Sequence, residues 1–366
     1  MMLLSLNVQT VWYVKCPIPF SAIAYGKLFK ENAESVVTAG EDGIVRIFAV
    51  PEKTSHLKTL QMKRSLETKC GPALHVVLKD VTRLSPCDML VADTRGSVVL
   101  FCDGQILNRK GSVSGKSSQI TAVEIQETSM GHVNVIIGRD DGEILCFNTF
   151  SQLWRIRLDD CIKEKVQGCV SVTCILTTSI ITQSSCGVGS DHILVADTQG
   201  YVYIIVGNQV KKVLTAPSVV KTMVSGQFLQ TEDSSPNQQS LTQIALGCEN
   251  GSIWLCVDFS IDLSSPYAEI GYPISELRSV PAKGNYTQGT TSADSIVDLL
   301  ICAGHFPSLL VLQHGKVMHT HNLPSWPVTI CGLADYMSKK DAVNSDAKTK
   351  LLVGCRDSSL HLISIT

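Results

Sequence analysis

The chain has 366 residues, of which 44% are hydrophobic and 17% are charged, and its formal net charge is −2. This composition can supply a packed core, and the near-neutral charge gives no electrostatic basis for binding nucleic acid or an acidic membrane surface. Segment 1–15 lacks the basic start and continuous apolar stretch of a signal peptide, and no run approaches the roughly 18 apolar residues that span a bilayer. We therefore expect a soluble, cytoplasmic protein with no nucleic-acid partner and no direct membrane insertion.

A strand, a small residue, a polar tight turn and a second strand recur along the whole chain. The repeat length is about 50 residues, which is typical of β-propeller blades. Seven hairpins are predicted, at 36–48, 89–101, 135–147, 193–205, 244–257, 299–312 and 351–363, and the sixth is degenerate. The sequence therefore predicts an all-β fold, a single seven-bladed β-propeller over residues 1–366.

Glycine marks most of the predicted turns. The dipeptides Asp42-Gly43, Asp141-Gly142 and Asn250-Gly251 tolerate positive φ and match the twist of the flanking strands. We expect neighbouring blades to approach closely at a small residue four places before the turn glycine. This small residue is Ala39, Ala92, Gly138, Ala196, Gly247 or, in the last copy, Gly354.

Outer strands are predicted after five of the hairpins, at 57–63, 105–110, 152–158, 209–214 and 316–323. The seventh hairpin is followed by no such strand. Segment 9–16 (QTVWYVKC) resembles segment 152–158 (QLWRIRL), so we infer that the N-terminal strand completes the last blade and closes the propeller. Closure of this kind removes exposed sheet edges.

Candidate metal and catalytic motifs are few. The 14 cysteines contain no C-x-x-C pair, and we expect free thiols that pack as small apolar side chains. His319 and His321 fall on the same face of one predicted strand, which makes a zinc pair conceivable, with an ordinary exposed strand face as the alternative. The sequence thus predicts no catalytic residue, no cofactor and no metal site.

Segments 231–240, 281–294 and 337–350 are polar and precede the first hairpin strand of successive blades, either as tolerated insertions or as a partner-contacting rim. The sixth unit carries Phe306 and Pro307 where its siblings have a polar turn, and Trp326 follows in the connection to the next blade. Both connections should emerge on one face of a propeller. We therefore predict a protein-interaction site at Phe306, Pro307 and Trp326, with packing of both aromatic rings inside the fold as the alternative.

The hairpin units, LVADTxGSVxLF and VxAGEDGxVRIF, resemble the degenerate FG-GAP and WD-like blades of propeller scaffold subunits. The integrin-alpha FG-GAP-repeat-containing protein and kaptin belong to this family, and the propellers of Bardet-Biedl complex subunits are more distant. The Gly-His opening and Trp-Asp ending of WD repeats are missing, as are the calcium loops of FG-GAP repeats.

The resemblance implies a non-catalytic scaffold subunit of a multiprotein complex such as KICSTOR, which regulates nutrient signalling by mTOR complex 1. It also implies recruitment to the lysosome, or to another organelle surface, through protein partners. Two alternatives stay open. One is a propeller in a ciliary, vesicle-trafficking or ubiquitin-ligase complex. The other is a propeller enzyme with a site in the central channel, which the mostly apolar inner strands disfavour.

Overall fold

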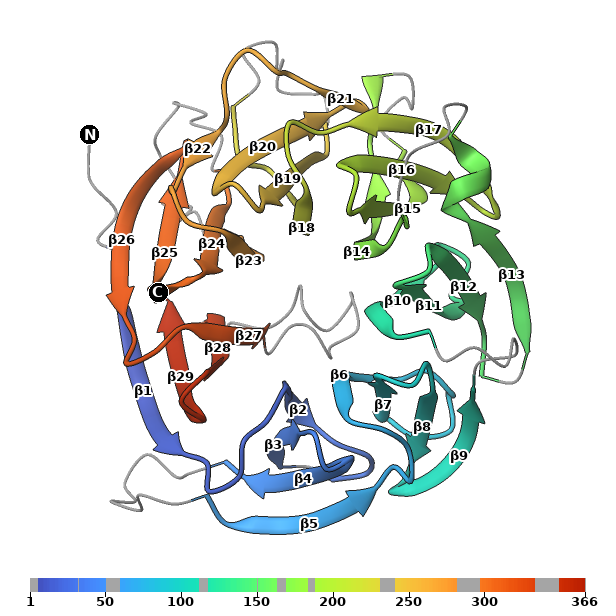
Figure 1. Cartoon of the computed structure of the whole chain (residues 1–366). Helices are drawn as coiled ribbons and strands as arrows, with labels where there is room; N and C mark the ends of the chain where they lie inside the picture. The colour runs from blue at the N-terminus through green and yellow to red at the C-terminus, as the bar shows by residue number, and fades with distance from the viewer. Residues whose placement is uncertain are drawn as a thin grey trace, which may run out of the picture. The chain divides into compact units, whose positions relative to one another are not determined.

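The computed structural model describes residues 6–31, 33–50, 60–111, 118–149, 151–162, 169–183, 188–230, 241–281, 297–332 and 349–365. Within these ranges the chain forms β-strands and one short 3-10 helix, η1 (Leu158–Cys161). The strands pair into seven antiparallel sheets, the blades of a β-propeller (Figure 1). The all-β, seven-bladed fold predicted from the repeat is confirmed.

The first three blades are four-stranded sheets in chain order. Blade 1 contains β2 (Ala22–Lys27), β3 (Glu34–Ala39), β4 (Ile44–Ala49) and β5 (Met62–Glu67). Blade 2 contains β6 (Ala73–Lys79), β7 (Asp88–Asp93), β8 (Val98–Cys102) and β9 (Gln105–Lys110). Blade 3 contains β10 (Ile120–Glu127), β11 (Val133–Arg139), β12 (Glu143–Phe147) and β13 (Gln152–Arg157). The fourth strand of each blade is its outer strand.

Blades 4 to 6 follow the same order, with one irregularity. Blade 4 contains β14 (Val172–Ile180), β15 (Ser190–Asp197), β16 (Tyr201–Val206) and β17 (Gln209–Thr215). Blade 5 contains β18 (Val220–Gly226), β19 (Gln243–Cys248) and β20 (Ser252–Val257), with two short pieces, β21 (Ser260–Ile261) and β22 (Ala268–Glu269), paired to opposite ends of β20. Blade 6 contains β23 (Ile274–Val280), β24 (Leu299–Gly304), β25 (Phe306–Gln313) and β26 (Lys316–Asn322).

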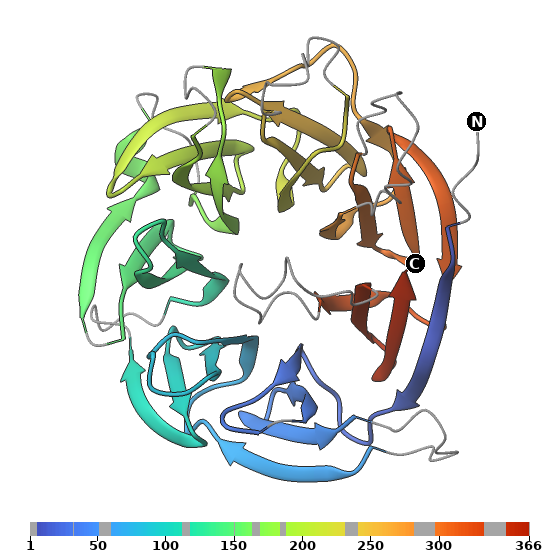
Figure 2. The ribbon, with the colours of Figure 1, turned by 180° about the vertical axis from the view of Figure 1, so that it is seen from behind.

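The seventh blade joins the two ends of the chain. Its strands are β27 (Pro327–Gly332), β28 (Thr349–Cys355), β29 (Ser359–Ile365) and β1 (Val8–Lys15). The ladder between β1 and β29 runs from Val8 opposite Ile365 to Lys15 opposite Ser359. Figures 1 and 2 show blue β1 beside red β29 from both sides. The predicted completion of the last blade by the N-terminal strand is confirmed.

The chain divides into two compact units, residues 1–173 with 323–366 and residues 174–322. The first, unit 1, holds blades 1 to 3 and blade 7. The second, unit 2, holds blades 4 to 6 apart from the first two residues of β14. The prediction of one domain over residues 1–366 stays a prediction.

The core lies between neighbouring blades. Val37 and Ile47 of blade 1 pack in one cluster with Met89 and Phe101 of blade 2. Phe48, the residue after Ile47, enters a different cluster, which is shared by blades 7 and 1. Successive residues of a strand point to opposite faces of the sheet, so the middle strands are apolar on both faces and read as continuous Val, Ile and Leu runs.

Turn glycines and small residues behave as the sequence predicts. Gly43 has a φ of 69° and Gly251 a φ of 87°, a region that side chains with a Cβ rarely adopt. A Cβ added at Gly354 would come within 2.6 Å of the Phe20 ring, which lies ahead of β2. One added at Gly247 would come within 2.8 Å of Ile274 in blade 6. The crowding between neighbouring blades is confirmed at these two positions.

Buried aspartates fix the turns of two blades. Asp197 accepts two backbone N–H bonds from its own turn, at 2.9 Å each, and the Tyr203 hydroxyl donates to it at 2.8 Å. Asp93 likewise accepts two N–H bonds from its own turn and a third from Gly71 at 2.8 Å. These carboxylates are used within the fold.

A β-bulge occurs at the same place in six outer strands. In blade 2, Leu100 and Phe101 pair with Asn108 and Ile106, which leaves Leu107 as the extra residue. A bulge twists the strand and hinders pairing with another chain. The equivalent extra residues are Val11, Lys63, Leu153, Lys211 and Met318.

The outer strand of blade 1 departs from the prediction. It lies at Met62–Glu67, so it overlaps the predicted range 57–63 only in its first two residues, and 57–59 lie outside the described residues. Only Leu66 of this strand is buried, so its sequence lacks the alternation that identifies a half-buried strand. Segments 231–240 and 337–348, and most of 281–294, lie outside the described residues. Among the described residues, no helix is long and apolar enough to cross a membrane.

Candidate protein-interaction surface

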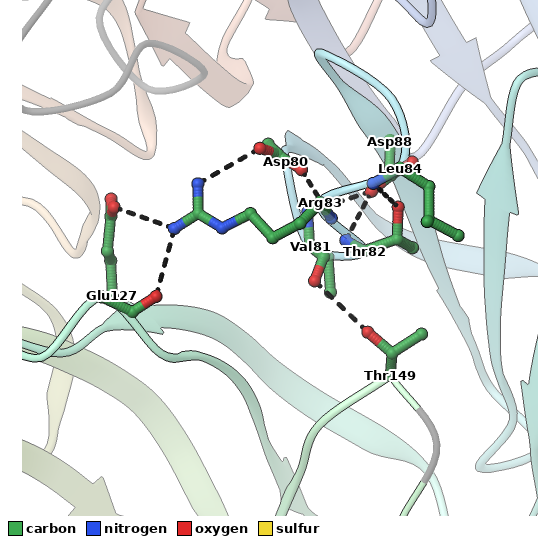
Figure 3. Close-up of polar contacts among 9 residues, drawn as sticks. Asp80, Val81, Thr82, Arg83, Leu84, Asp88, Glu127 and Thr149 are labelled. Atoms are coloured by element: carbon green, nitrogen blue, oxygen red, sulfur yellow. Dashed lines mark hydrogen bonds and ion pairs between the residues drawn. The ribbon is translucent and has the colours of Figure 1, made fainter.

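The connection between β6 and β7 in blade 2 is held in one shape by its own polar groups. The buried carboxylate of Asp88 accepts the backbone N–H of Val81 at 3.0 Å and that of Thr82 at 2.7 Å. The Thr82 hydroxyl accepts the N–H of Leu84 at 3.1 Å. Figure 3 shows these bonds around the loop. These bonds hold the loop against itself and against the start of β7.

Arg83 connects this loop to blade 3. Its guanidinium donates to Asp80 at 3.2 Å, to Glu127 at 3.2 Å and to the carbonyl of Gly131 at 3.3 Å (Figure 3). Partial burial opposes the charge, but the bonds to Glu127 and Asp80 raise the pKa of Arg83, so the bridge stays ionised. The backbone φ of Arg83 is 61°, which is uncommon for a residue with a side chain and tends to occur at functional sites.

Two large apolar side chains project next to this bridge. Leu84 is 64% exposed, and Met130, in the equivalent connection of blade 3, is 80% exposed. Single exposed apolar residues are ordinary on protein surfaces. Here, however, both follow the first strands of neighbouring blades, and Arg83 ties the two connections together. We call residues 80–84 and 127–131 the Leu84–Met130 surface.

Sequence reasoning missed this surface. The partners of Arg83 in blade 3 lie 44 and 48 positions further along the chain. The available signal was weak: a charged Asp80-Val81-Thr82-Arg83 stretch before an exposed leucine in a connection between strands. That sequence pattern is common in loops. It indicates an interaction surface only once the structure shows that the connections of blades 2 and 3 contact each other.

Trp326 keeps part of its predicted exposure. It lies in unit 1 just ahead of β27, and its side chain is 40% exposed. The guanidinium of the exposed Arg356 lies 5.8 Å from the centre of the Trp326 ring, within cation–π range. The Arg356 N–H also donates to the Trp326 carbonyl at 2.9 Å. Trp and Arg are both enriched at interface hot spots.

Phe306 does not have the exposure that the sequence suggested. It is the first residue of β25 in unit 2 and is only 7% exposed. Its ring lies 6.1 Å from that of Tyr272, and it packs in the cluster shared by blades 5 and 6. Only His305 separates β24 from β25, so the turn is too short to hold Phe306, whereas Pro307 is exposed. Trp326 and Phe306 lie in different units, and their proximity stays a prediction.

Metal-ligating side chains do not gather in the described ranges. The rings of His319 and His321 stack with centres 6.4 Å apart, and burial together with the charge of His319 lowers the pKa of His321. No group of three His, Cys, Asp or Glu side chains suited to a metal occurs in the part of the chain that the structure describes. The candidate zinc pair therefore has no third ligand among these residues.

The cysteines of the core hairpins pack as the sequence predicts, whereas Cys169 is exposed. Cys146, Cys248, Cys256, Cys302 and Cys355 are free and buried. Burial raises the pKa of Cys146, Cys256 and Cys302 to about 12. A thiol with so high a pKa is a poor nucleophile at neutral pH, because the reactive species is the thiolate.

No family model and no curated protein matches the chain. Solved structures do match it. BBS1N in complex with ARL6DN aligns with a TM-score of 0.66 over 98% of this chain and 97% of that chain, at 13% sequence identity. The WD40 β-propeller domain of Doa1 aligns with a TM-score of 0.60 over the same shares, at 12% identity. The chain is thus similar in fold to WD40-type β-propellers.

Proposed function

We propose that this chain is a non-catalytic protein-interaction scaffold and a subunit of a multiprotein complex. The Leu84–Met130 surface carries the proposal. Two exposed apolar side chains on connections of fixed shape can be buried by a partner at little entropic cost. Burying a Leu or Met side chain contributes about 1.5–3 kcal/mol, and a few such residues commonly dominate an interface.

A scaffold is favoured over a propeller enzyme because the polar side chains of the hairpin turns already have partners. Asp197 accepts the Tyr203 hydroxyl and two turn N–H groups, and Asp93 accepts three N–H groups. A catalytic acid or base must be able to reach a substrate proton. The likeness to the propeller of BBS1N, solved in complex with ARL6DN, adds support for a protein partner.

The particular assembly that we propose is a KICSTOR-like complex that regulates mTOR complex 1 signalling, with the chain in the cytoplasm and recruited to the lysosome through partners. The FG-GAP-like pattern of the hairpins supports this assignment. The alternative is a propeller subunit of a ciliary, vesicle-trafficking or ubiquitin-ligase complex. The identity of co-purified subunits separates the two.

The test is affinity purification of the full chain from cells, followed by mass spectrometry. We expect Leu84→Asp and Met130→Asp each to reduce recovery of the partner subunits at least tenfold while the melting temperature stays unchanged. Leu153→Asp is the matched control, since Leu153 is 47% exposed on the outer strand of blade 3. Wild-type recovery with both surface variants, or equal loss with Leu153→Asp, would rule out this surface.

A further inference from the structure

The outer strands of unit 1 are basic although the chain as a whole is slightly acidic. Strands β1, β5, β9 and β13 contain seven basic residues and one acidic residue, a net charge of +6, whereas the whole chain carries −2. The basic residues are Lys15, Lys63, Arg64, Arg109, Lys110, Arg155 and Arg157. This uneven distribution indicates a surface suited to an anionic partner.

Several of these charges already have acidic partners. Lys63 pairs with Glu31 at 2.9 Å, and Arg157 lies 3.4 Å from Asp159. Arg64 and Arg109 differ from Lys63 and Arg157 in the groups that they contact. Within the described ranges, each donates to a backbone carbonyl and neither pairs with a carboxylate. Their full charges therefore remain available at the surface.

These two arginines connect blades 1 and 2 in opposite directions. Arg64 of β5 donates to the carbonyl of Gly104, ahead of β9, at 3.2 Å. Arg109 of β9 donates to the carbonyl of Thr68, after β5, at 2.7 Å. A Cβ at Gly104 would fall within 2.7 Å of the Arg64 guanidinium carbon, so the side chain packs closely there. Figures 1 and 2 show β5 and β9 following one another along the edge of blades 1 and 2.

Ile106 lies on the same side of β9 as Arg109. Ile106 pairs with Phe101 and Arg109 with Val99, and both of these partners belong to the cluster between blades 1 and 2. Arg64 pairs with Ile47 of the same cluster. Residues opposite each other in an antiparallel ladder share a face. The three side chains therefore face the same seam, and Ile106 is 38% exposed.

The acidic residues near this seam do not cancel its charge. Asp103 pairs with Lys30 at 2.7 Å. Glu67 pairs in the ladder with Ile44, one position away from the Val45–Leu66 pair that faces the cluster, and so it lies on the opposite face of β5. We call the seam defined by Arg64, Ile106 and Arg109 the arginine seam.

We propose that the arginine seam binds an extended acidic segment of a partner protein, with two carboxylates that flank an apolar residue. Thr68 lies four residues after Arg64, which corresponds to about 13 Å of extended backbone at 3.3 Å per residue, and we take this as the spacing of the two carbonyl anchors, at Gly104 and Thr68. The two carboxylates should therefore be about four residues apart in an extended chain. Guanidinium groups already fixed by hydrogen bonds bind carboxylates with little further loss of entropy.

A protein segment fits the seam better than a lipid surface or a nucleic acid. Two fixed guanidinium groups with an apolar residue between them match a short linear pattern. Membrane attachment by charge uses clusters of 4–8 basic residues at about 1 kcal/mol each, and nucleic-acid affinity comes from many phosphate contacts. The seam is separate from the Leu84–Met130 surface, so either proposal can fail without the other.

The test is fluorescence anisotropy on the full chain with a labelled Gly-Ser-Glu-Thr-Val-Thr-Glu-Ser-Gly peptide at low ionic strength. We expect binding that weakens at least fivefold in Arg64→Gln and in Arg109→Gln. Arg157→Gln is the matched control and should bind as the wild type does, because Arg157 is an outer-strand arginine with its own acidic partner. The same peptide with Lys in place of Glu should not bind. About 0.5 M salt should abolish binding, because it screens the charges.

Circular dichroism melting checks that the variants are folded. If Arg64→Gln does not fold, Arg64→Lys keeps the charge, and a twofold or larger loss of affinity in that variant supports the seam equally. Absence of peptide binding, or equal binding by the wild type and both Gln variants, would overturn the proposal. Stronger, Arg64-dependent binding to phosphatidylserine vesicles or to a single-stranded oligonucleotide would overturn it in favour of those ligands.

Discussion

Blades 1 and 3 close their hairpins with the same kind of bond in two different environments. In blade 1, Arg46 pairs with Asp42 at 2.5 Å, and these side chains are 11% and 40% exposed. In blade 3, Arg139 pairs with Glu143 at 2.6 Å, and these side chains are 3% and 5% exposed. Both pairs join residues four positions apart: Arg139 and Glu143 flank their turn, whereas Asp42 lies within its turn and Arg46 in the following strand. Their lengths are nearly equal, so the difference lies in the surroundings.

The comparison shows that bond length alone does not set the energetic role of an ion pair. Water solvates the partners of an exposed pair when the pair is broken, so such a pair contributes about 0–1 kcal/mol. A buried charge that loses its partner has no such compensation, and the loss costs about 3–5 kcal/mol. Glu143 also pairs with the half-exposed Arg155, so one carboxylate compensates two guanidinium groups.

The largest expected effect is that of Glu143→Gln. This change leaves the buried guanidinium of Arg139 without a counter-charge, and we expect the free energy of unfolding to fall by about 3 kcal/mol or more. Urea unfolding followed by circular dichroism measures it. A loss below about 1 kcal/mol would show that the two pairs are energetically alike.

His75 in blade 2 differs from both ion pairs, because it is a partly buried titratable group that stays neutral. Burial lowers its pKa to about 4, with hydrogen bonds to the backbone of Ile120 and Thr121 acting the other way. The folded-state pKa lies below the ordinary value of 6.5, so the unfolded chain binds more protons between these two values. Stability should therefore fall by about 3 kcal/mol as the pH drops through this window. Unfolding curves of His75→Gln should lack this decrease, and an identical pH profile would refute the assignment.

A double variant that removes Arg139 and Glu143 together tests whether the buried pair itself stabilises blade 3. Replacement of a buried ion pair by apolar side chains is often neutral or stabilising. We expect the double variant Arg139→Met with Glu143→Leu to lie within about 1 kcal/mol of the wild type, because Arg155 is half exposed and can be solvated by water. A double-mutant cycle with the two single variants measures the coupling. A double variant as unstable as Glu143→Gln alone would contradict the explanation.

Asp42→Asn should have a much smaller effect than its counterpart in blade 3. We expect a loss of about 1 kcal/mol, because the Asp42 carboxylate is 40% exposed and water can reach this end of the pair, although the Arg46 side chain is only 11% exposed. The same urea titration measures it, with the wild type at about 0.5 M salt as a second control, since salt screens an exposed pair. A loss as large as that of Glu143→Gln would indicate that the turn of blade 1 is buried in solution.

The smallest effect is the acid titration of Asp42. The hydrogen bond from Arg46 is the main cause that lowers the pKa of Asp42 below its ordinary value of 3.8. The contribution of this pair is therefore present above pH 3.8 and is lost as the pH falls through the lower, folded-state value. The free energy of unfolding is measured against pH for the single variant His75→Gln and for the double variant His75→Gln with Asp42→Asn. The difference between the two curves gives the contribution of Asp42. Curves that diverge only above pH 5 would exclude Asp42 as its source.

The sequence predicted the features that repeat. The seven hairpins, the positive φ of Gly43 and its equivalents, and the closure by segment 9–15 each rest on a local pattern that occurs several times. One hairpin with an atypical sequence therefore does not change the predicted fold. Even the turn of blade 7, where Ser358 replaces glycine, has a φ of 65°.

The sequence did not predict features that depend on one side chain and its neighbours in space. Phe306 resembled an exposed turn residue, because nothing nearby in the sequence shows that Tyr272 packs against it. The strand at Met62–Glu67 buries only Leu66, so the alternation of buried and exposed residues that would locate it in the sequence is absent. The bridge from Arg83 to Glu127 joins two blades, and such contacts follow no repeat.

The buried cysteines can be used to measure how often each blade opens, because their thiols react only in the open state. A thiol with a pKa near 12 is ionised in roughly one molecule in 10⁵ at pH 7, so alkylating reagents must wait until its blade opens. Cys146 in blade 3, Cys256 in blade 5 and Cys302 in blade 6 each sample a different blade. The rate at which mass spectrometry finds each cysteine alkylated therefore ranks the blades by opening free energy, with no label introduced into the chain.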